Sequence, residues 1–273
     1  MSQGLFNGKP ASGPWLHRGF QYGDGVFRTC LIYRGHILDL KGQLDKLSAD
    51  ARRLRLRTPR AALTREAQEL AKGRAIAVLK MFLLRSGAER GYRVHSSASD
   101  RLLLLYPAPR YAAANWSRGV AVARSGFALA GQPALAGVKH LNRLEQVIAA
   151  STSPRSADEA IVGDERGRPV AGTRTNLFWV KGGRLHTPPL ARCGVAGRMR
   201  DRVLALAARA LRPKTAQVEI SWNELLRADE VFLTNSLIGI WPVRALGRRR
   251  WAAPGPVTRR LMEELAHPRL TRA

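Results

Sequence analysis

Residues 137–147 read Gly-Val-Lys-His-Leu-Asn-Arg-Leu-Glu-Gln-Val, and the rest of the chain is best interpreted outward from them. Leu141, Leu144 and Val147 recur at helical spacing, which predicts a helix with one face packed inward. Lys139 comes just before that face, at the start of the predicted helix. If packing removes water from its ammonium group, the pKa of Lys139 falls and its amine becomes available for Schiff-base chemistry. A solvated surface lysine is the simpler alternative.

The residues around this lysine resemble those of a known family. The segment 136–147 looks like the active-site segment of the 4-amino-4-deoxychorismate lyases, which belong to the class IV, fold-type IV enzymes that use pyridoxal phosphate. The resemblance runs nearly from end to end, from Gly-Phe-Gln-Tyr-Gly-Asp-Gly-Val-Phe at 19–27 to Thr-Asn-Ser-Leu at 234–237. In the family, the residue matching Lys139 carries the cofactor. Aminotransferases of the same class keep this lysine but share little of the sequence after it, so the segment favours a lyase.

The resemblance implies an α/β (α+β) fold of two α/β domains, with the cofactor in the cleft between them. It also implies a homodimer whose sites draw on both subunits. A proline-rich break at 107–110 marks the expected linker, because prolines interrupt the preceding strand pattern. We therefore predict an N-terminal α/β domain over residues 1–110 and a cofactor-binding α/β domain over residues 111–273.

Hydrophobic periodicity and turn residues agree with a mixed fold. A strand hairpin is predicted over 26–40, followed by an amphipathic helix over 44–56. The remaining predicted strands lie at 75–84, 102–106, 119–124 and 230–233, and residues 158–170 read as strand, charged turn and strand. The remaining predicted helices lie within 60–80 and at 203–211, 224–229 and 255–273.

Two parts of the sequence match the phosphate-binding parts of the family. On the helix over 44–56 the family writes His-x-x-Arg-Leu, and its arginine grips the cofactor phosphate. Gln43 and Lys46 stand at the matching positions. A lysine meets phosphate as a point charge and lacks the two-pronged guanidinium fork, so we expect phosphate binding to survive in weakened form.

The second phosphate-binding part combines two loops. A glycine-bearing loop that opens a helix presents backbone N–H groups to an anion, and Gly197 ends such a loop. The resemblance assigns the phosphate to this turn and to the loop after the strand at 230–233. The expected cofactor-binding residues, besides Lys139 and Lys46, are therefore Gly197, Arg198, Met199, Asn235, Ser236 and Leu237.

One family residue is missing. The family writes Glu-x-x-x-x-Asn-Leu-Phe, and its glutamate bonds the pyridine nitrogen of the cofactor. Five residues before Asn176 the chain has Ala171, and the carboxylates Asp164 and Glu165 lie across the preceding turn. A carboxylate keeps the ring nitrogen protonated and the ring electron-poor. Transamination depends on this more than elimination does, so Ala171 disfavours an aminotransferase more than a lyase.

Candidate catalytic and substrate residues lie in the N-terminal half and in the lysine segment. Thr29 falls on the first predicted strand, and the resemblance implies that it protonates the leaving group. The loop over 85–92 resembles the lyase loop Arg-Gly-x-Gly-x-Arg-Gly-Tyr, which suggests that Arg85 or Arg90 binds substrate carboxylates through its guanidinium fork. Asn142 completes the expected substrate-binding set.

The net charge of +26 at pH 7 is unusual for a metabolic enzyme. Such a charge favours acidic partners. The arginines are scattered, however, and runs such as Arg248–Arg250 belong to no basic tail, zinc-finger spacing or RNA-binding signature. We expect the charge to attract a small anionic substrate and do not predict a nucleic-acid partner.

No apolar run approaches the roughly 20 residues that a membrane helix needs, so no membrane association is expected. The first residues show no charged segment followed by an apolar core, which predicts no signal peptide and a cytoplasmic location. Cys30 and Cys193 lie far apart in unrelated contexts, which indicates neither a disulfide framework nor a metal site.

Together, the residues and the resemblance predict a pyridoxal-phosphate-dependent carbon–oxygen lyase. It would convert 4-amino-4-deoxychorismate to 4-aminobenzoate and pyruvate in folate biosynthesis, with Lys139 as the base and Thr29 as the proton donor. One alternative is a class IV aminotransferase for branched-chain or D-amino acids. Another is a degenerate, non-catalytic member of the family, which the residues at Lys46 and Ala171 favour.

Overall fold

The structure is a computed structural model that describes residues 5–6, 9–10, 17–87, 89–211 and 215–272. The chain groups into two compact units. Unit 1 comprises Met1–Pro107 and Val138–Asn142, and unit 2 comprises Ala108–Gly137 and Arg143–Ala273. The domain boundary after residue 110 stays a proposal, and one segment departs from it because Lys139 groups with unit 1. Most of the start of the chain, where no signal peptide is predicted, lies outside the described residues.

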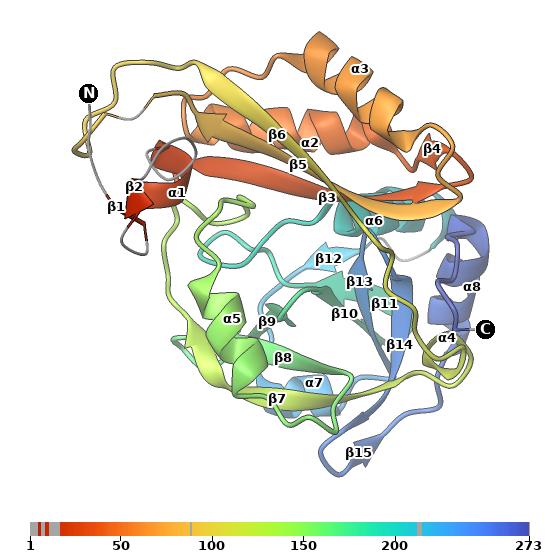
Figure 1. The fold of residues 1–273 in the computed structure, drawn as a ribbon. Helices are drawn as coiled ribbons and strands as arrows, with labels where there is room; N and C mark the ends of the chain where they lie inside the picture. Colours follow the sequence, from red (N-terminus) through yellow and green to blue (C-terminus); the bar gives the residue numbers. More distant parts are fainter. Residues whose placement is uncertain (1–4, 7–8, 11–16, 88, 212–214, 273) are drawn as a thin grey trace. The chain divides into compact units, whose positions relative to one another are not determined.

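Unit 1 is an antiparallel sheet with two helices on one face (Figure 1). The sheet order is β4-β3-β5-β6, and a separate short pair joins β1 to β2. The predicted hairpin, first helix and strands near 75–84 and 102–106 all form. The elements are β1 (Leu5–Phe6), β2 (Lys9–Pro10), α1 (Arg18–Tyr22), β3 (Gly25–Tyr33), β4 (His36–Ile37), α2 (Leu40–Arg53), α3 (Arg60–Ala71), β5 (Ile76–Arg85) and β6 (Ser99–Tyr106).

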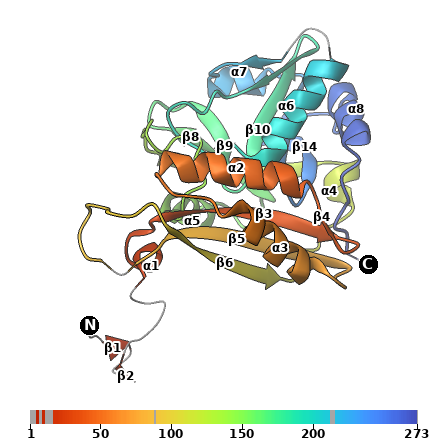
Figure 2. The same ribbon diagram turned by 90° about the horizontal axis from the view of Figure 1, so that it is seen from above.

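The two faces of strand β3 have different neighbours, since side chains alternate along a strand. Val26, Cys30 and Ile32 belong to one buried cluster with apolar residues of α2, α3 and β5. Phe27 and Thr29 are half-buried on the opposite face. Figure 2 shows α2 and α3 lying over the same sheet in a second view. Strand β3 therefore has one face covered by α2 and α3 and an opposite face that bears Phe27 and Thr29.

Unit 2 is a nine-stranded sheet with helices packed on it. The strand order is β12-β11-β10-β13-β14-β7-β8-β9, and a pairing of Asn176 with Ala171 joins β10 to β9, so the strands from β10 to β9 close into a ring. The elements are α4 (Ala114–Ser117), β7 (Val120–Leu129), α5 (Leu144–Ser151), β8 (Glu159–Asp164), β9 (Pro169–Gly172), β10 (Asn176–Lys181), β11 (Arg184–Thr187), α6 (Arg198–Ala210), β12 (Ala216–Gln217), α7 (Trp222–Leu226), β13 (Glu230–Asn235), β14 (Gly239–Leu246), β15 (Arg249–Arg250) and α8 (Pro256–Leu265).

The main core of unit 2 lies between its sheet and two helices. Phe178 of β10 and Phe232 of β13 stack with ring centroids 4.9 Å apart. Met199 and Val203 of α6 and Leu261 of α8 join the same buried cluster. This packing fixes the start of α6, which comes directly after the predicted glycine loop.

The helix predicted to begin at the lysine segment is wrong in its start and in its inward face. Helix α5 begins only at Leu144, whose side chain is 74% exposed, and Val147 is 56% exposed. The preceding residues pair with β3 instead, through a bridge between Val26 and His140. Once a backbone N–H and C=O bond to a strand, they no longer serve a helix, so the helix starts later.

Within the described ranges no helix combines the length and apolarity that a membrane crossing requires. No group of three or more His, Cys, Asp or Glu residues able to hold a metal ion occurs in that part of the chain either.

Candidate active site

Lys139 is held as an extended residue against the edge of β3 in unit 1. The Phe27 N–H donates to the Lys139 carbonyl at 3.0 Å, and the Leu141 N–H donates to the Gly25 carbonyl at 3.1 Å. Val138, just before the lysine, is buried in the same core as α2 and α3. The backbone on both sides of Lys139 is therefore fixed.

A buried ion pair fixes the remaining backbone group of Lys139. Its N–H donates to Asp50 Oδ2 at 3.0 Å, and the same oxygen accepts from Arg28 Nη2. Asp50 is 5% exposed and Arg28 2% exposed. A buried charge pair is favourable only when both partners are well placed, and removal of one partner is costly. Asp50 and Arg28 thus determine where the lysine segment can lie.

The side chain of Lys139 lies over the face of β3 that the helices leave uncovered. Its Nζ is 4.3 Å from the centroid of the Phe27 ring, a favourable place for an ammonium. Thr29 is two residues beyond Phe27 on β3, so its side chain is on the same face of the sheet. The two residues are separated by about 7 Å along the strand. Unit 1 therefore presents the predicted base and the predicted proton donor on one sheet face.

Lys46 belongs to the same neighbourhood of unit 1. It lies on α2 one helical turn before Asp50, and residues four apart on a helix share a face. Lys46 is half-buried, and Gln43, one turn earlier, is buried. The structure thus brings Lys46 to the helix face whose Asp50 holds the Lys139 backbone. Its role toward phosphate stays a proposal.

The two candidate substrate arginines differ in their surroundings. Arg85 is buried, and its guanidinium donates to Asp24 Oδ2 at 2.8 Å, to the Ser96 carbonyl and to the Leu54 carbonyl. Arg90 is exposed and forms no hydrogen bond or ion pair with the residues that the structure describes. Because the Arg85 donors already have acceptors in the fold, Arg90 is the better candidate.

Asn142 is packed against a glycine turn of unit 1. Gly23 has φ +61°, and a Cβ added there would lie 2.2 Å from Asn142 Oδ1. Any residue with a side chain at position 23 would therefore displace Asn142. Its substrate-binding role stays a proposal.

In unit 2 the start of α6 is held by Asn176. The Gly197 N–H donates to Asn176 Oδ1 at 3.1 Å, and Asn176 Nδ2 donates to the Val195 carbonyl at 2.7 Å. A Cβ at position 197 would lie 2.4 Å from Asn176 Oδ1, so this close approach requires glycine. Asp201 is the first residue whose N–H bonds back into the helix, to Gly197. The first-turn amides of a helix set the direction in which it binds an anion.

Among the predicted phosphate ligands at this helix, Met199 differs from Arg198. Its side chain is 3% exposed and packs into the core of unit 2. Its side chain is therefore not available to an anion, which leaves its backbone N–H as the candidate donor. Arg198 is half-buried at the first position of the helix.

The second loop of unit 2 is shaped by Asn235 at the end of β13. Asn235 Oδ1 accepts from the N–H groups of Leu237 at 2.9 Å and Ile238 at 3.0 Å, and Nδ2 donates to the Arg174 carbonyl. The Asn235 amide therefore folds the loop around half-buried Ser236. Because Asn176 pairs with Thr234 on the adjacent strand, the two asparagines that hold these loops lie at the same end of the neighbouring strands β10 and β13.

His267 packs against this loop. Its Nε2 lies 3.3 Å from the Leu237 carbonyl, and its ring fills the space beside Gly239. Burial lowers the pKa of His267 from 6.5 to about 4, and this outweighs the opposing hydrogen bond to Leu237. The imidazole is therefore neutral at physiological pH.

The position of the missing glutamate is apolar. Ala171 is 6% exposed and belongs to a buried cluster with Val162 and Leu190. Glu159, a buried carboxylate of strand β8, accepts from the Thr173 N–H and hydroxyl. Ala171 pairs with Val162, so side-chain alternation places Glu159 on the other face of the sheet. Glu159 therefore does not replace the carboxylate.

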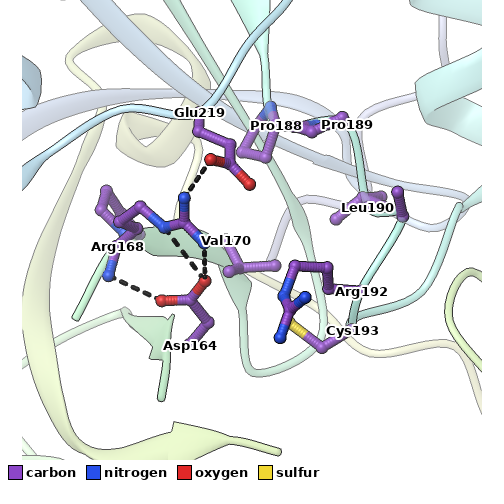
Figure 3. A pocket seen from close by; sticks show the side chains of 11 residues that line it. Asp164, Arg168, Val170, Pro188, Pro189, Leu190, Arg192, Cys193 and Glu219 are labelled. Atoms are coloured by element: carbon purple, nitrogen blue, oxygen red, sulfur yellow. Dashed lines mark hydrogen bonds and ion pairs between the residues drawn. The ribbon is translucent and has the colours of Figure 1, made fainter. Parts of the chain in front are cut away.

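Neither of the acids across the turn replaces it, because Asp164 accepts from Arg168 and the exposed Glu165 accepts from Arg192 and from the Gly131 N–H. Arg168 bonds both Asp164, at 2.9 Å, and Glu219, and these residues line a cavity of about 40 Å³ (Figure 3). Such a space admits a water or two but no cofactor. Cys193 also lines it, and burial raises the pKa of its thiol to about 11, which leaves it protonated and unreactive.

Comparison with known proteins identifies the family. A family model described as amino-transferase class IV matches residues 25–246. The chain belongs to this family. It is 32% identical over 270 residues to an aminodeoxychorismate lyase from Vibrio harveyi, over 95% of this chain and 98% of that protein. It is 28% identical to a putative branched-chain-amino-acid aminotransferase from Methanocaldococcus jannaschii, over 90% of this chain and 87% of that protein.

A solved class IV structure also matches in fold. The crystal structure of 4-amino-4-deoxychorismate lyase from Pseudomonas aeruginosa has a TM-score of 0.87 and 39% sequence identity, over 95% of this chain and 96% of that one. The resemblance and the α/β fold predicted from the sequence are thereby confirmed.

Sequence reasoning missed three residues that position candidate groups within their own unit, Arg28 and Asp50 in unit 1 and Asn176 in unit 2. Arg28 and Asp50 were readable as charges on faces that the apolar pattern predicts to be buried, which calls for a partner. Asn176 is part of the Asn-Leu-Phe segment used to locate Ala171. Its side chain was not recognised as the group that holds the glycine loop.

Proposed function

We propose that this chain is a pyridoxal-phosphate-dependent lyase that converts 4-amino-4-deoxychorismate to 4-aminobenzoate and pyruvate. The observation that carries this proposal is the placement of Lys139, with its backbone fixed on all sides and its Nζ over Phe27, on the face that also bears Thr29. The lyase-like segment around it and the similarity to lyases over almost the whole chain support the same activity.

The residues present fit pyridoxal phosphate at two of its three groups. In unit 1, Lys139 would provide the amine and Lys46 a positive charge for the phosphate. In unit 2, the amides of Gly197–Met199 and of the Asn235–Leu237 loop would provide donors for the phosphate. Asn176 and Asn235 shape these loops with their own amides. Nothing acidic stands at Ala171 to meet the ring nitrogen. When bound, the cofactor supplies an electron-accepting ring.

The proton transfers are assigned to two side chains. The Lys139 amine removes the substrate ring proton on the carbon that bears nitrogen. The adjacent carbon–oxygen bond then breaks, and its electron pair leaves with enolpyruvate, which Thr29 protonates while the substrate ring becomes aromatic. Enolpyruvate then rearranges to pyruvate. Arg90 and Asn142 are the proposed groups for the substrate carboxylates.

The apolar surroundings of Ala171 favour elimination over transamination. With pyridoxal phosphate bound, transamination would rely heavily on a protonated ring nitrogen, which an acid at position 171 would favour, whereas expulsion of enolpyruvate would depend on it less. Ala171→Glu should therefore raise any aminotransferase activity by a larger factor than lyase activity. Both rates measured on both proteins decide this, and a native protein that transaminates briskly would identify it as an aminotransferase instead.

The test of the main proposal combines a covalent and a catalytic readout. The protein is loaded with pyridoxal phosphate, treated with borohydride and digested, and the modified peptide is located by mass. We expect the cofactor mass on Lys139, release of 4-aminobenzoate before reduction, and loss of both in Lys139→Ala. Modification of another lysine would refute the assignment, and a protein that takes up no cofactor would identify a non-catalytic family member.

We further propose a homodimer, on the strength of the family resemblance, together with a small anionic substrate and a cytoplasmic location. Light scattering on the purified, cofactor-loaded protein tests the dimer.

A further inference from the structure

A concave surface of unit 2 gathers arginines in one place. It encloses about 600 Å³ and is bordered by β7, by the turn between β14 and β15, and by α7. The arginines that line it are Arg124, Arg244, Arg248, Arg249 and Arg250. All five side chains are exposed, and no Asp or Glu occurs among the lining residues. We call this surface the arginine groove.

Three arginines of this groove are held in position by backbone carbonyl oxygens, and the Asp229 carboxylate interacts electrostatically with one of them, Arg249. Arg244 Nε donates to the Gly119 carbonyl at 3.1 Å, and Arg250 Nη1 donates to the Gly247 carbonyl at 2.5 Å. Arg249 Nη2 donates to the Ala228 carbonyl. Carbonyl oxygens orient a guanidinium but leave its full charge.

The arginines elsewhere in the chain are often paired with acids. Arg101 meets Glu66, and Arg168 meets Asp164 and Glu219. In contrast, none of the five groove arginines comes within ion-pair distance of a carboxylate in the described part of the chain. Clustered like charges destabilise a fold through repulsion, and an anionic ligand removes that cost.

The groove also contains a stacking platform. The Arg124 guanidinium lies 4.5 Å from the ring centroid of half-buried Trp222. Guanidinium planes and aromatic rings are the surfaces on which unpaired bases stack, and positively charged grooves track the phosphate backbone. A basic concavity with such a platform matches single-stranded nucleic acid.

The other large anions fit this groove less well. Insertion into an anionic membrane needs exposed large apolar side chains beside the charges. None of the lining residues is among the exposed large hydrophobics of the described chain. A small anion would fill only part of an open space of this size, and an acidic peptide would make no use of the platform.

We propose that the arginine groove binds single-stranded nucleic acid through its phosphates, independently of the proposed lyase activity. The test uses a fluorescein-labelled oligothymidylate of roughly 15 nucleotides and measures its anisotropy at several salt concentrations. Five phosphate contacts predict a slope of log K against log salt of about −3.5. The triple variant R248Q/R249Q/R250Q should bind at least about tenfold more weakly at low salt and reduce the slope by about 2.

A matched control separates the groove from the total charge. Arg65, Arg74 and Arg93 are exposed arginines of unit 1 outside the groove, and R65Q/R74Q/R93Q removes the same three charges. We expect this control to retain most of the affinity and slope. Equal losses in the two triple variants would overturn the proposal, because binding would then reflect net charge alone.

Competition decides the class of ligand. Unlabelled oligothymidylate should displace the probe, whereas polyglutamate at equal charge and phosphatidylserine vesicles should displace it poorly. Displacement by either at equal charge would overturn the assignment to nucleic acid. Thermal melts establish that each variant is folded, and if the groove triple is not, R248Q alone must reduce the slope by about 0.7. Lyase activity, if present, should be unchanged in R248Q.

Discussion

The lysine region of unit 1 and the two loops of unit 2 position their backbones by different chemistry. Around Lys139 the deciding group is a charge, the buried Asp50 carboxylate paired with Arg28. Around the loops the deciding groups are neutral amides, those of Asn176 and Asn235. A buried ion pair allows few alternative arrangements, whereas a carboxamide bond has a smaller cost when it is broken. The fold therefore holds the proposed base more rigidly than the proposed phosphate loops.

The largest effect should come from removing the Asp50 carboxylate, the charged group that positions Lys139. Asp50→Ala removes the buried carboxylate that forms an ion pair with the buried Arg28, so we expect a loss of roughly 3–5 kcal/mol in the free energy of unfolding. It also frees the Lys139 N–H, so borohydride labelling of Lys139 should fall in whatever protein remains folded. Urea denaturation and peptide mass measure the two effects.

A double variant isolates the role of the charge. Arg28→Met with Asp50→Leu removes both charges, and such apolar replacements are often neutral or stabilising. We expect near-normal stability but reduced labelling, because the acceptor of the Lys139 N–H is gone. If Asp50→Ala cost less than about 1 kcal/mol, the ion pair would not be what places the lysine.

The stability of unit 2 should fall in acid because His267, which packs against the loop after β13, becomes protonated. Its folded pKa of about 4 lies below the ordinary value of 6.5, so the unfolded chain binds the extra proton first as the pH falls. The stabilisation is complete above pH 6.5 and is lost as the pH falls toward 4. The two pKa values correspond to about 3 kcal/mol. His267→Gln should flatten the dependence of unfolding free energy on pH in this window, and parallel curves would contradict the effect.

The predicted fold succeeds where a local pattern and the tertiary contacts agree. Strands β3, β5 and β13 match their β-branched and apolar runs, and α6 matches its apolar period. The lysine segment fails because its spacing fits a helix while its backbone bonds to β3. A partner strand more than 100 residues earlier in the chain leaves no mark on local periodicity.

The site was predictable where a residue type is tied to its chemistry. Lys139, Gly197 and the absence of an acid at Ala171 can be read from the motif, although their functional roles stay proposals. Asp50 and Asn176 act through backbone groups of distant residues, and such bonds depend on tertiary distance alone. Arg85 is the opposite case. Its loop matches the family motif, but its guanidinium bonds acceptors within the fold.

Removing the Asn176 carboxamide tests directly how the glycine loop of unit 2 is held. Asn176→Ala takes the acceptor from the Gly197 N–H and the donor from the Val195 carbonyl, at a cost of about 1–2 kcal/mol in unfolding free energy. Because the loop then loses its support, affinity for pyridoxal phosphate should also fall. Fluorescence titration measures the affinity. Asn235→Ala, which alters the neighbouring loop, is the comparison variant. If Asn176→Ala lost more stability than Asp50→Ala, the amide-held loop would be held more firmly than the lysine segment, contrary to our expectation.

The smallest effect, and the finest test of the comparison, concerns Lys46. Lys46 lies on the same face of α2 as Asp50. The phosphate that we propose for it is also the one proposed for the Gly197 and Asn235 loops. Lys46→Arg replaces a point charge by a two-pronged donor and should tighten pyridoxal phosphate binding by a few-fold, since one added bond to a charged group is partly offset by ordering the longer side chain. Lys46→Met is the control and should weaken binding, whereas Lys41→Arg, on the exposed face of α2, should change nothing. Equal affinities in the native protein, Lys46→Arg and Lys46→Met would remove Lys46 from the site and leave the phosphate to the loops of unit 2.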